Sequence, residues 1–302
     1  MRFQWLGITA AVLAALAVPA TAASAAPERA APSTLVVSGA VSDPASYTVA
    51  ALAALPQENV TLPAPGGRTV QATGVSLDAL VNSAAPVLPD VKNGLLRVVV
   101  TASGPGGHRV SFALGELDPS FGDHDAVVLL SVNGRHLRAP ALAVPGDQTP
   151  ARDRLVLSRV SVQVTSPVVT VPPASGALVI ENGTHTAVLS AARLARLPRR
   201  TLTVTFLAGT TPETLTESGP TLAAVLRAAH VGTNLGTWVA AVGSDGYVAD
   251  VTPAEAWPGG RPLLVSLAEN GTALAAPRLV ADGDVKGGRY VSGVDDLVVG
   301  RG

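Results

Sequence analysis

The sequence contains no cysteine, and its only methionine is Met1. Without cysteine the chain can form no disulfide, offers no thiol nucleophile and has no thiolate with which to bind a metal. Aromatic residues are also scarce, at 3% of the 302 residues, although 47% of the residues are hydrophobic. The core must therefore be built from small aliphatic side chains, and its stability must come from packing.

A large excess of one charge is also absent, because the formal net charge is −1 and the basic residues are dispersed along the chain. This balance argues against nucleic acid or an anionic membrane as a partner. Lysine is rare, with only Lys92 and Lys286 present. A bias toward arginine is typical of a GC-rich bacterial genome, and we draw no functional prediction from it.

Residues 1–26 have the pattern of a signal peptide. Met1-Arg2 is a short positive start, residues 5–18 are apolar, and small residues at 20–25 provide a cleavage site. The apolar run is short for a transmembrane helix, and no later segment has the apolar length to span a bilayer. The leader lacks a twin-arginine pair and a cysteine for lipid attachment. We therefore expect a secreted or periplasmic protein that crosses the membrane unfolded by the general secretory route.

The remaining sequence contains two copies of one pattern. The matched pairs occur in the same order with similar spacing, which is the signature of a tandem repeat. They are LAALP at 52–56 and LARLP at 194–198, GVSLDAL at 74–80 and GPTLAAV at 219–225, Asn133-Gly134 and Asn270-Gly271, and Gly146-Asp147 and Gly283-Asp284. The sequence predicts two modules, residues 34–165 and 176–302, joined by a Pro-rich linker at 166–175.

Each module has the pattern of an α+β domain. Continuous apolar runs predict buried strands, and Ser or Thr before helical spacing predicts short capped helices. Predicted strands lie at 35–38, 46–48, 59–62, 69–73, 95–102, 109–112, 126–132, 178–181, 202–207, 237–242, 247–251 and 263–267, and predicted helices at 49–55, 76–81, 114–117, 190–197 and 221–229.

The order of these motifs resembles the molybdopterin-binding domain of the sulfite oxidase family. The resemblance rests on "DPASYTVAALAALPQENVTLPAPGGRTVQATGVSLDALV", on "GSDGYVADVTPAEAW" and on "LAENGTALAAPRLVADGDVKGGRYVSGVDDLVV", and it covers nearly all of the mature chain, once per module. It implies a mixed-sheet, partly β-grasp-like α+β fold. It also implies, if the family function is retained, a molybdopterin cofactor and an oxidoreductase activity.

Three departures from the family pattern argue against that activity. The family binds molybdenum by a cysteine just after its Val-Thr strand, but here residues 60–64 read VTLPA and residues 204–208 read VTFLA. Neither segment offers a soft ligand. The late lysine of the family is Leu157 in the first copy and Ser292 in the second, while Arg154 remains nearby. Exported members of the family resemble one another in folding around the cofactor before transport behind a twin-arginine leader, which is also missing. We therefore expect no bound cofactor and no catalytic residues.

The second module carries the best candidate binding residues. They are Asp245 and Tyr247 in a tight turn, and Lys286, Arg289 and Tyr290 in a Gly-rich loop. Two tyrosines beside two cations can stack on a planar ligand and hold an anionic group. The first module has Gly106-Gly107-His108 and Thr149-Pro150-Ala151-Arg152 in those places. A hairpin turn and solvated loop charges are the alternative interpretation.

Metal sites and familiar hydrolase sites are weaker hypotheses. His108, His124 and His136, with Asp123 and Asp125, could converge as a metal site, but the second module lacks these histidines. Residues 281–284 are similar to a calcium loop, yet no glutamate closes the loop at the required spacing. The chain has no Gly-x-Ser-x-Gly, Ser-x-x-Lys or His-Glu-x-x-His motif.

The sequence therefore favours a secreted, non-redox ligand-binding or interaction module over an enzyme. The ligand class would be a small planar or anionic molecule, and the oligomeric state stays open. Two alternatives remain: a molybdenum-cofactor oxidoreductase with non-cysteine ligation, and a cell-surface structural spacer. A binding protein requires a basic or aromatic-lined cleft, whereas a spacer requires none.

Overall fold

The computed structural model describes residues 34–302 except 65, 154 and 168–173. The predicted signal peptide, Arg154 and the proline-rich part of the predicted linker therefore lie outside the described residues. Residues Pro32–Gly302 form one compact unit. Within the described part of the chain the strands form four sheets, and the helices are short. The predicted α+β class is thus confirmed.

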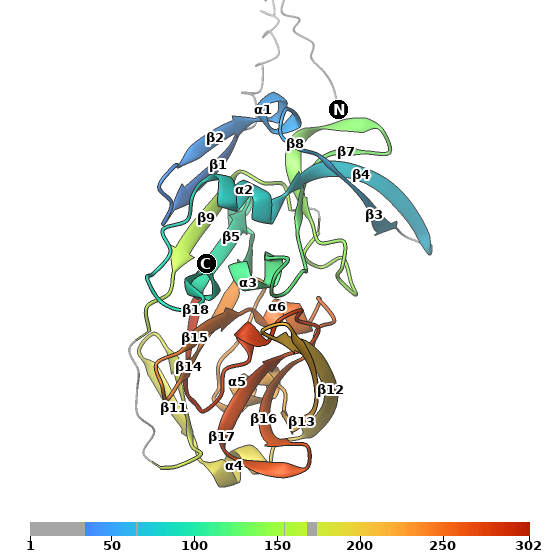
Figure 1. The fold of residues 1–302 in the computed structure, drawn as a ribbon. Helices are drawn as coiled ribbons and strands as arrows, with labels where there is room; N and C mark the ends of the chain where they lie inside the picture. The colour runs from blue at the N-terminus through green and yellow to red at the C-terminus, as the bar shows by residue number, and fades with distance from the viewer. Residues whose placement is uncertain (1–33, 65, 154, 168–173) are drawn as a thin grey trace, which may run out of the picture. The chain divides into compact units, whose positions relative to one another are not determined.

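The first repeat consists mainly of strands, with short helices between them (Figure 1). Its elements are β1 (Thr34–Gly39), β2 (Ala45–Thr48), α1 (Val49–Ala53), β3 (Glu58–Ala64), β4 (Arg68–Ser76), α2 (Leu77–Ser83), η1 (Gly94–Arg97), β5 (Val98–Ser103), η2 (Pro105–Gly107), β6 (Arg109–Ala113), α3 (Leu114–Leu117), β7 (Val127–Val132), β8 (Arg135–Ala143) and β9 (Arg159–Val164).

The second repeat follows in a similar order. Its elements are β10 (Leu178–Asn182), β11 (His185–Leu189), α4 (Ala191–Ala195), β12 (Arg199–Ala208), β13 (Thr211–Pro220), α5 (Leu222–Ala228), β14 (Thr237–Gly243), β15 (Val248–Val251), α6 (Pro253–Ala256), β16 (Leu263–Glu269), β17 (Thr272–Ala281), η3 (Gly287–Arg289) and β18 (Val294–Arg301).

The two repeats have the same strand order. The larger sheet runs β2-β1-β9-β5-β6 in the first repeat and β11-β10-β18-β14-β15 in the second. The smaller sheet runs β3-β4-β7-β8 in the first and β12-β13-β16-β17 in the second. In each larger sheet the first strand pairs in parallel with the last strand of its repeat. The repeated sequence pattern therefore produces a repeated topology.

The matched motifs occupy matched structural positions. Asn133-Gly134 and Asn270-Gly271 form the turns of the β7–β8 and β16–β17 hairpins, and each of the four residues has a positive φ, as a type I′ hairpin turn requires. The helices α2 and α5 begin with equivalent caps, in which the side chain of Ser76 or Thr221 accepts a hydrogen bond from the backbone amide three residues later.

Small aliphatic residues fill one large core in each repeat, as the composition predicts. Strands β5 and β14, which the sequence predicts as buried, are almost entirely inaccessible to solvent. The two cores are not separate, because Leu96 and Phe121 of the first repeat pack in the core of the second. Val99 of the first repeat likewise packs with Trp238 and Val242 of the second. Part of the contact between the repeats is therefore apolar.

The predicted strand at 95–102 begins later than expected. Gly94–Arg97 form a turn of 3-10 helix, and β5 starts at Val98. Asn93 adopts a left-handed conformation, and Gly94 lies so close to the carbonyl of Pro89 that a Cβ atom would clash. Leu96 packs in the core of the second repeat. An apolar run in the sequence does not distinguish such a buried helical turn from a buried strand.

Several strands have no clear signal in the sequence. Strand β13 contains Pro212, two glutamates and Gly219, yet it pairs with β12 over ten residues. Strands β8, β9, β11, β17 and β18 were also not predicted by periodicity. Pairing with a neighbouring strand overrides a weak local preference for β structure. Among the described residues, no helix is both long enough and apolar enough to cross a bilayer.

Candidate functional site

Four of the five predicted binding residues line one pocket of about 570 Å³. Asp245 and Tyr247 come from the turn between β14 and β15, and Lys286 and Tyr290 flank η3. The first repeat adds residues that the sequence did not indicate. The lining residues are Lys92, Asn93, Phe121, Phe206, Leu207, Ala208, Gly209, Asp245, Tyr247, Lys286, Gly287, Gly288, Tyr290 and Ser292. The pocket therefore lies where the two repeats meet.

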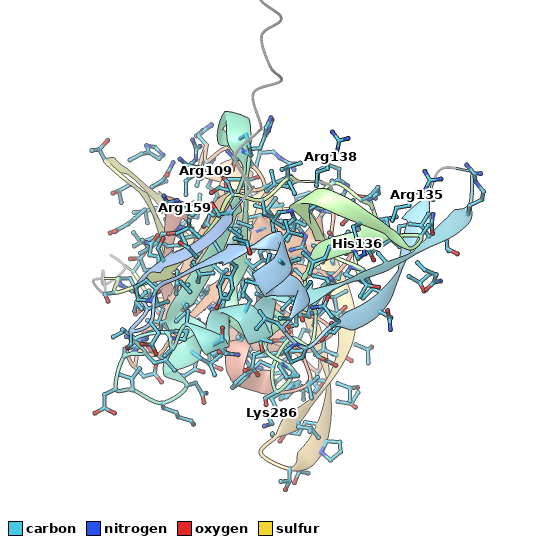
Figure 2. The ribbon with its side chains drawn as sticks, turned by 90° about the horizontal axis from the view of Figure 1, so that it is seen from above. Arg109, Arg135, His136, Arg138, Arg159 and Lys286 are labelled. Carbon is cyan, nitrogen blue, oxygen red and sulfur yellow. The ribbon has the colours of Figure 1, made fainter. Side chains whose placement is uncertain are left out.

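Both lysines of the protein line this pocket. Lys92 precedes η1 in the first repeat, and Lys286 precedes η3 in the second. In Figure 2, Lys286 lies well away from the labelled arginines, which belong to other surfaces. Nothing in the sequence indicates that residues so far apart along the chain meet, so sequence reasoning missed Lys92. The rarity of lysine makes their meeting in one pocket informative.

Tyr247 joins the loops that carry these lysines. Its hydroxyl donates a hydrogen bond of 2.7 Å to the carbonyl of Gly288. The same oxygen accepts a hydrogen bond of 2.9 Å from Nδ2 of Asn93, the residue after Lys92. Nη2 of Arg97 adds a hydrogen bond of 2.9 Å to the carbonyl of Gly246. The turn of the second repeat is thus fixed to the first repeat by side chains on both sides.

The Gly-rich loop lies between two aromatic rings. A Cβ atom on Gly287 would stand 2.6 Å from the ring of Phe206, and one on Gly288 would stand 2.3 Å from the ring of Phe121. Such distances exclude any larger residue unless the rings move. The backbone amide of Leu207 also donates to the carbonyl of Val285 over 2.8 Å, which attaches the end of β12 to the loop. Glycine is therefore needed here for close packing.

Aromatic side chains form one wall of the pocket. The ring centroids of Phe206 and Tyr290 are 4.5 Å apart and the rings are tilted by 39°, within the range of favourable aromatic pairs. The hydroxyl of Tyr290 is buried and, within the described residues, has no hydrogen-bond partner. Burial raises the pKa of Tyr290, and the carboxylates of Asp284 and Asp282 raise it further. The wall therefore offers flat apolar surface to a ligand.

Asp245 is the only acidic residue among the described lining residues. It is exposed, and its Oδ1 accepts a hydrogen bond of 3.0 Å from the backbone amide of Tyr247. Burial raises the pKa of Tyr247, and the charge of Asp245 raises it further. The hydrogen bond from Asn93 lowers the pKa. The lysines outnumber this carboxylate, so the lining is positively charged.

Arg289 does not belong to the pocket lining, which corrects its assignment as a surface residue able to contact a ligand. Its side chain is 0% exposed. Nε and Nη2 donate to the two carboxylate oxygens of Asp284 over 2.9 and 2.5 Å, and Nη1 donates to Glu255 over 2.6 Å. A bidentate pair of this kind is strong and geometrically specific. Each of its three nitrogens donates to a buried carboxylate, so Arg289 has a structural role.

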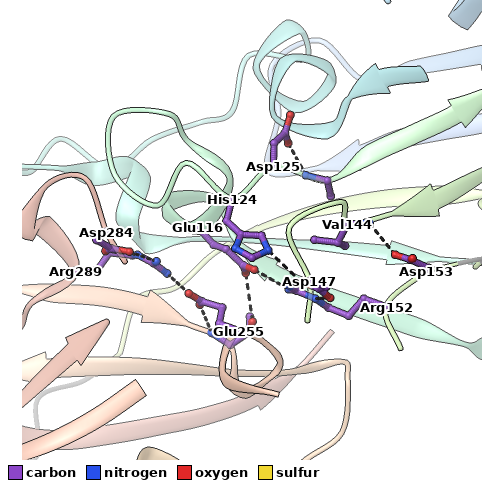
Figure 3. Close-up of polar contacts among 12 residues, drawn as sticks. Glu116, His124, Asp125, Val144, Asp147, Arg152, Asp153, Glu255, Asp284 and Arg289 are labelled. Carbon is purple, nitrogen blue, oxygen red and sulfur yellow. Dashed lines mark hydrogen bonds and ion pairs between the residues drawn. The ribbon is translucent and has the colours of Figure 1, made fainter. Parts of the chain in front are cut away.

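The first repeat contains an equivalent buried cluster (Figure 3). Arg152, also 0% exposed, pairs with both oxygens of Asp147 and, over 2.6 Å, with Glu116. In each repeat the arginine lies five residues after the aspartate, and the glutamate is the third residue of a one-turn helix. The repeated Gly-Asp motif aligns the two aspartates but does not by itself indicate the ion pairs. The repeated spacing from aspartate to arginine is the signal that could have revealed them.

The two clusters are adjacent across the contact between the repeats. Oγ1 of Thr252 lies 3.4 Å from Oε2 of Glu116, to which it donates, while the backbone amide of Thr252 donates to Glu255. Burial raises the pKa of Glu116 to about 7; Arg152 lowers it and the nearby Glu255 raises it. Burial likewise raises the pKa of Asp284 to about 6. Burial therefore opposes ionisation of these carboxyl groups, and their arginine partners favour it.

The predicted histidine cluster is not formed. His124 is buried and its Nε2 lies 3.1 Å from Oδ1 of Asp147, whereas His108 and His136 line different pockets. Asp125 caps the backbone amide of Ala126. Within residues 34–302, apart from the few that are not described, no three His, Cys, Asp or Glu side chains form a group able to hold a metal ion.

The loop at 281–284 is a turn stabilised by ion pairs. Gly283 has a positive φ of 84°, and the Asp284 carboxylate that follows is committed to Arg289 and Arg261. The calcium-loop hypothesis has no support from this arrangement, because the carboxylate already has two cationic partners.

The corresponding pocket of the first repeat has different chemistry. The backbone amide of Gly104 donates to the carbonyl of His108, and the backbone amide of Gly243 donates to the carbonyl of Tyr247. His108 and Tyr247 therefore occupy equivalent positions. Counting from the paired arginines, Thr149, Asp153 and Leu155 correspond to Lys286, Tyr290 and Ser292. The counterpart of Ser292 is thus Leu155, which corrects the match to Leu157. The pocket of about 500 Å³ is lined by Pro105, His108, Val110, Ala151, Arg152, Asp153, Leu155, Val156 and Leu235. It has neither lysine nor tyrosine.

The residues of the larger pocket do not fit a molybdenum centre. The protein has no cysteine, and the segment after the Val-Thr step of β12 contributes Phe206, Leu207 and Ala208 to the pocket wall. A phenyl ring packed against Tyr290 stands in the region where the family resemblance would place the thiolate. Phenyl and aliphatic groups supply no donor to a soft metal.

No model of a known protein family matches the chain, and no curated protein sequence matches it significantly. Among solved structures, the chain is similar to the crystal structure of the sulfane dehydrogenase SoxCD from Paracoccus pantotrophus. The identity is 16% and the TM-score is 0.34, over 87% of this chain and 77% of that chain. This likeness is too distant to transfer that enzyme's fold or activity to this protein.

Proposed function

We propose that this is an exported, non-redox binding protein that holds a small anionic ligand with a planar apolar part. The observation that carries the proposal is that the two lysines of the chain, Lys92 and Lys286, line the same pocket as two tyrosines and two phenylalanines. Ammonium groups attract an anion, and aromatic walls bury flat apolar surface. A pocket of about 570 Å³ is of the size that small-molecule sites have.

The two alternatives are less well supported by the same pocket. A spacer has no need for a pocket that gathers the only lysines. An oxidoreductase of the sulfite oxidase type needs a thiolate, and Phe206 lines the pocket where that ligand is expected. The sulfite oxidase-like, partly β-grasp-like fold and the module limits 34–165 and 176–302 are part of this proposal, as is export by a signal peptide at 1–26.

A thermal-shift screen with small anions tests the proposal. The wild-type protein should be stabilised by at least one planar anion, because a ligand that binds only the folded state raises its stability. The double variant Lys92→Gln/Lys286→Gln should lose the shift. The matched control Arg135→Gln/Arg200→Gln removes the same charge at exposed positions outside the pocket and should keep it. Equal shifts in both double variants would show that the lysine pocket is not the binding site.

A further inference from the structure

The hydroxyl of Tyr247 stands between the two loops that carry the lysines. It bonds Asn93, the neighbour of Lys92, and Gly288, two residues after Lys286. Its proton is committed to the Gly288 carbonyl over 2.7 Å, so it has no proton to donate to a ligand. One oxygen atom thus connects a loop of the first repeat to a loop of the second, close in sequence to each lysine.

We propose that the pocket selects a flat ligand with two negative charges, and that Tyr247 is the positioning residue that sets the lysines for it. This inference rests on the proposed anion-binding function. It further specifies that the ligand carries two negative charges and that Tyr247 positions the two lysines that bind them. One ammonium group comes from each repeat, so a dianion interacts with both repeats at once.

The charges around the pocket favour a dianion over a monoanion. Lys92 and Lys286 line it, and Arg97 bonds the Gly246 carbonyl at its edge, while Asp245 is the only described acidic lining residue. A dianion can place one negative charge at each ammonium group, whereas a monoanion leaves one ammonium group without an anionic partner.

The walls favour a flat ligand. Phe206 and Tyr290 lie 4.5 Å apart, centroid to centroid, and Phe121 packs on the Gly-rich loop from the other side. These rings present flat apolar area without a charge, on which a planar ligand can stack. An aromatic dicarboxylate has this combination of a flat apolar centre and two separated negative charges.

The test compares terephthalate with benzoate, which share one ring and differ by one carboxylate, by titration calorimetry. Wild-type protein should bind terephthalate at least about fivefold more tightly than benzoate, and we call this ratio the terephthalate advantage. Two equivalent carboxylates alone would give a statistical advantage of about twofold. Lys92→Gln and Lys286→Gln should each reduce this advantage to about twofold. Tyr247→Phe should reduce the ratio of the two affinities in the same way without loss of charge.

Two further variants separate positioning from misfolding. Asn93→Ala breaks the same connection from the other loop and should reproduce the effect of Tyr247→Phe. Tyr47→Phe removes a tyrosine hydroxyl outside the pocket, whose contact with Ser83 is 3.5 Å long and exposed, and should keep the wild-type advantage. Circular dichroism checks that each variant is folded.

The outcomes distinguish this inference from the function on which it rests. If Tyr247→Phe and Asn93→Ala keep the terephthalate advantage while the lysine variants lose it, the positioning role is wrong. If wild-type protein binds both probes equally, or neither, the dianion selectivity is wrong. If the lysine variants bind both probes as wild type does, the anion pocket itself is wrong.

Discussion

Arg152 and Arg289 occupy equivalent positions in the two repeats, and both are fully buried. Each pairs through two nitrogens with an aspartate five residues earlier and through a third nitrogen with a glutamate from a one-turn helix. The two sets meet where the repeats join (Figure 3). The repeat has therefore retained an ionic centre while the pockets on either side of it have diverged.

Loss of either buried arginine should strongly destabilise the protein. Arg289→Met and Arg152→Met each remove the cation that two buried carboxylates share, and breaking a buried pair in this way typically costs about 3–5 kcal/mol of unfolding free energy. Urea unfolding measures the change. The exposed Arg135→Met should change stability by less than about 0.5 kcal/mol. A buried-arginine variant as stable as this control would contradict the structural role assigned to the cluster.

Asp250 should make the protein less stable as the pH rises. It is fully buried in β15, and the hydroxyl of Thr165 lies 3.0 Å from each carboxylate oxygen. Burial raises the pKa of Asp250 to about 8, although the bond from Thr165 and the charge of Arg97 lower it. The folded state therefore keeps a proton that the unfolded chain loses near pH 4, so the contribution of this group falls between about pH 4 and pH 8.

The variant Asp250→Asn should remove that dependence. Urea unfolding at pH 5 and pH 8 should show a smaller loss of unfolding free energy in the variant than in wild type, by an amount of the order of a few kcal/mol. Asp43→Asn, at an exposed carboxyl, should leave the wild-type loss in place. An unchanged loss in Asp250→Asn would mean that this carboxyl is ionised in the folded protein at both pH values.

Tyr290→Phe should not destabilise the protein. Its buried hydroxyl has no partner within the described residues, and a buried polar group without a hydrogen bond costs about 1–3 kcal/mol. Removal of the oxygen should leave the unfolding free energy unchanged or higher, with the packing on Phe206 retained. Thermal and urea unfolding are the measurements. A fall of more than about 1 kcal/mol would show that the hydroxyl makes a stabilising contact.

The pocket should respond to the charge of Asp245. This exposed carboxylate lines the pocket beside Tyr247 and repels an anionic ligand. Asp245→Asn should therefore bind terephthalate about twofold to fivefold more tightly, with the backbone hydrogen bond to the Tyr247 amide kept by the amide oxygen. Titration calorimetry gives the ratio, and weaker binding by the variant would argue against an anionic ligand.

The sequence predicts elements where local chemistry decides the structure. The apolar runs of β5 and β14, the caps at Ser76 and Thr221, and the two Asn-Gly turns are all visible in the sequence and present in the structure. Their patterns depend on hydrophobic burial, capping and backbone conformation within a few residues.

Tertiary contacts decide the rest. The meeting of Lys92 and Lys286 depends on how the repeats pack, for which the sequence holds no local signal. Arg289 was misplaced because loop position suggested exposure, whereas Asp284 and Glu255 compensate its buried charge. Strand β13 forms because β12 pairs with it along its length. In each case the deciding partner is distant in sequence, and a periodic pattern carries no information about it.

Native mass spectrometry of the mature protein purified from its own host tests the central claim most directly. The proposed function predicts the mass of the processed polypeptide together with a small non-covalent organic anion, free of molybdenum, that is lost from the variant Lys92→Gln/Lys286→Gln. A mass increment that contains about one molybdenum per chain, or a ligand that the double variant retains in full, would contradict it.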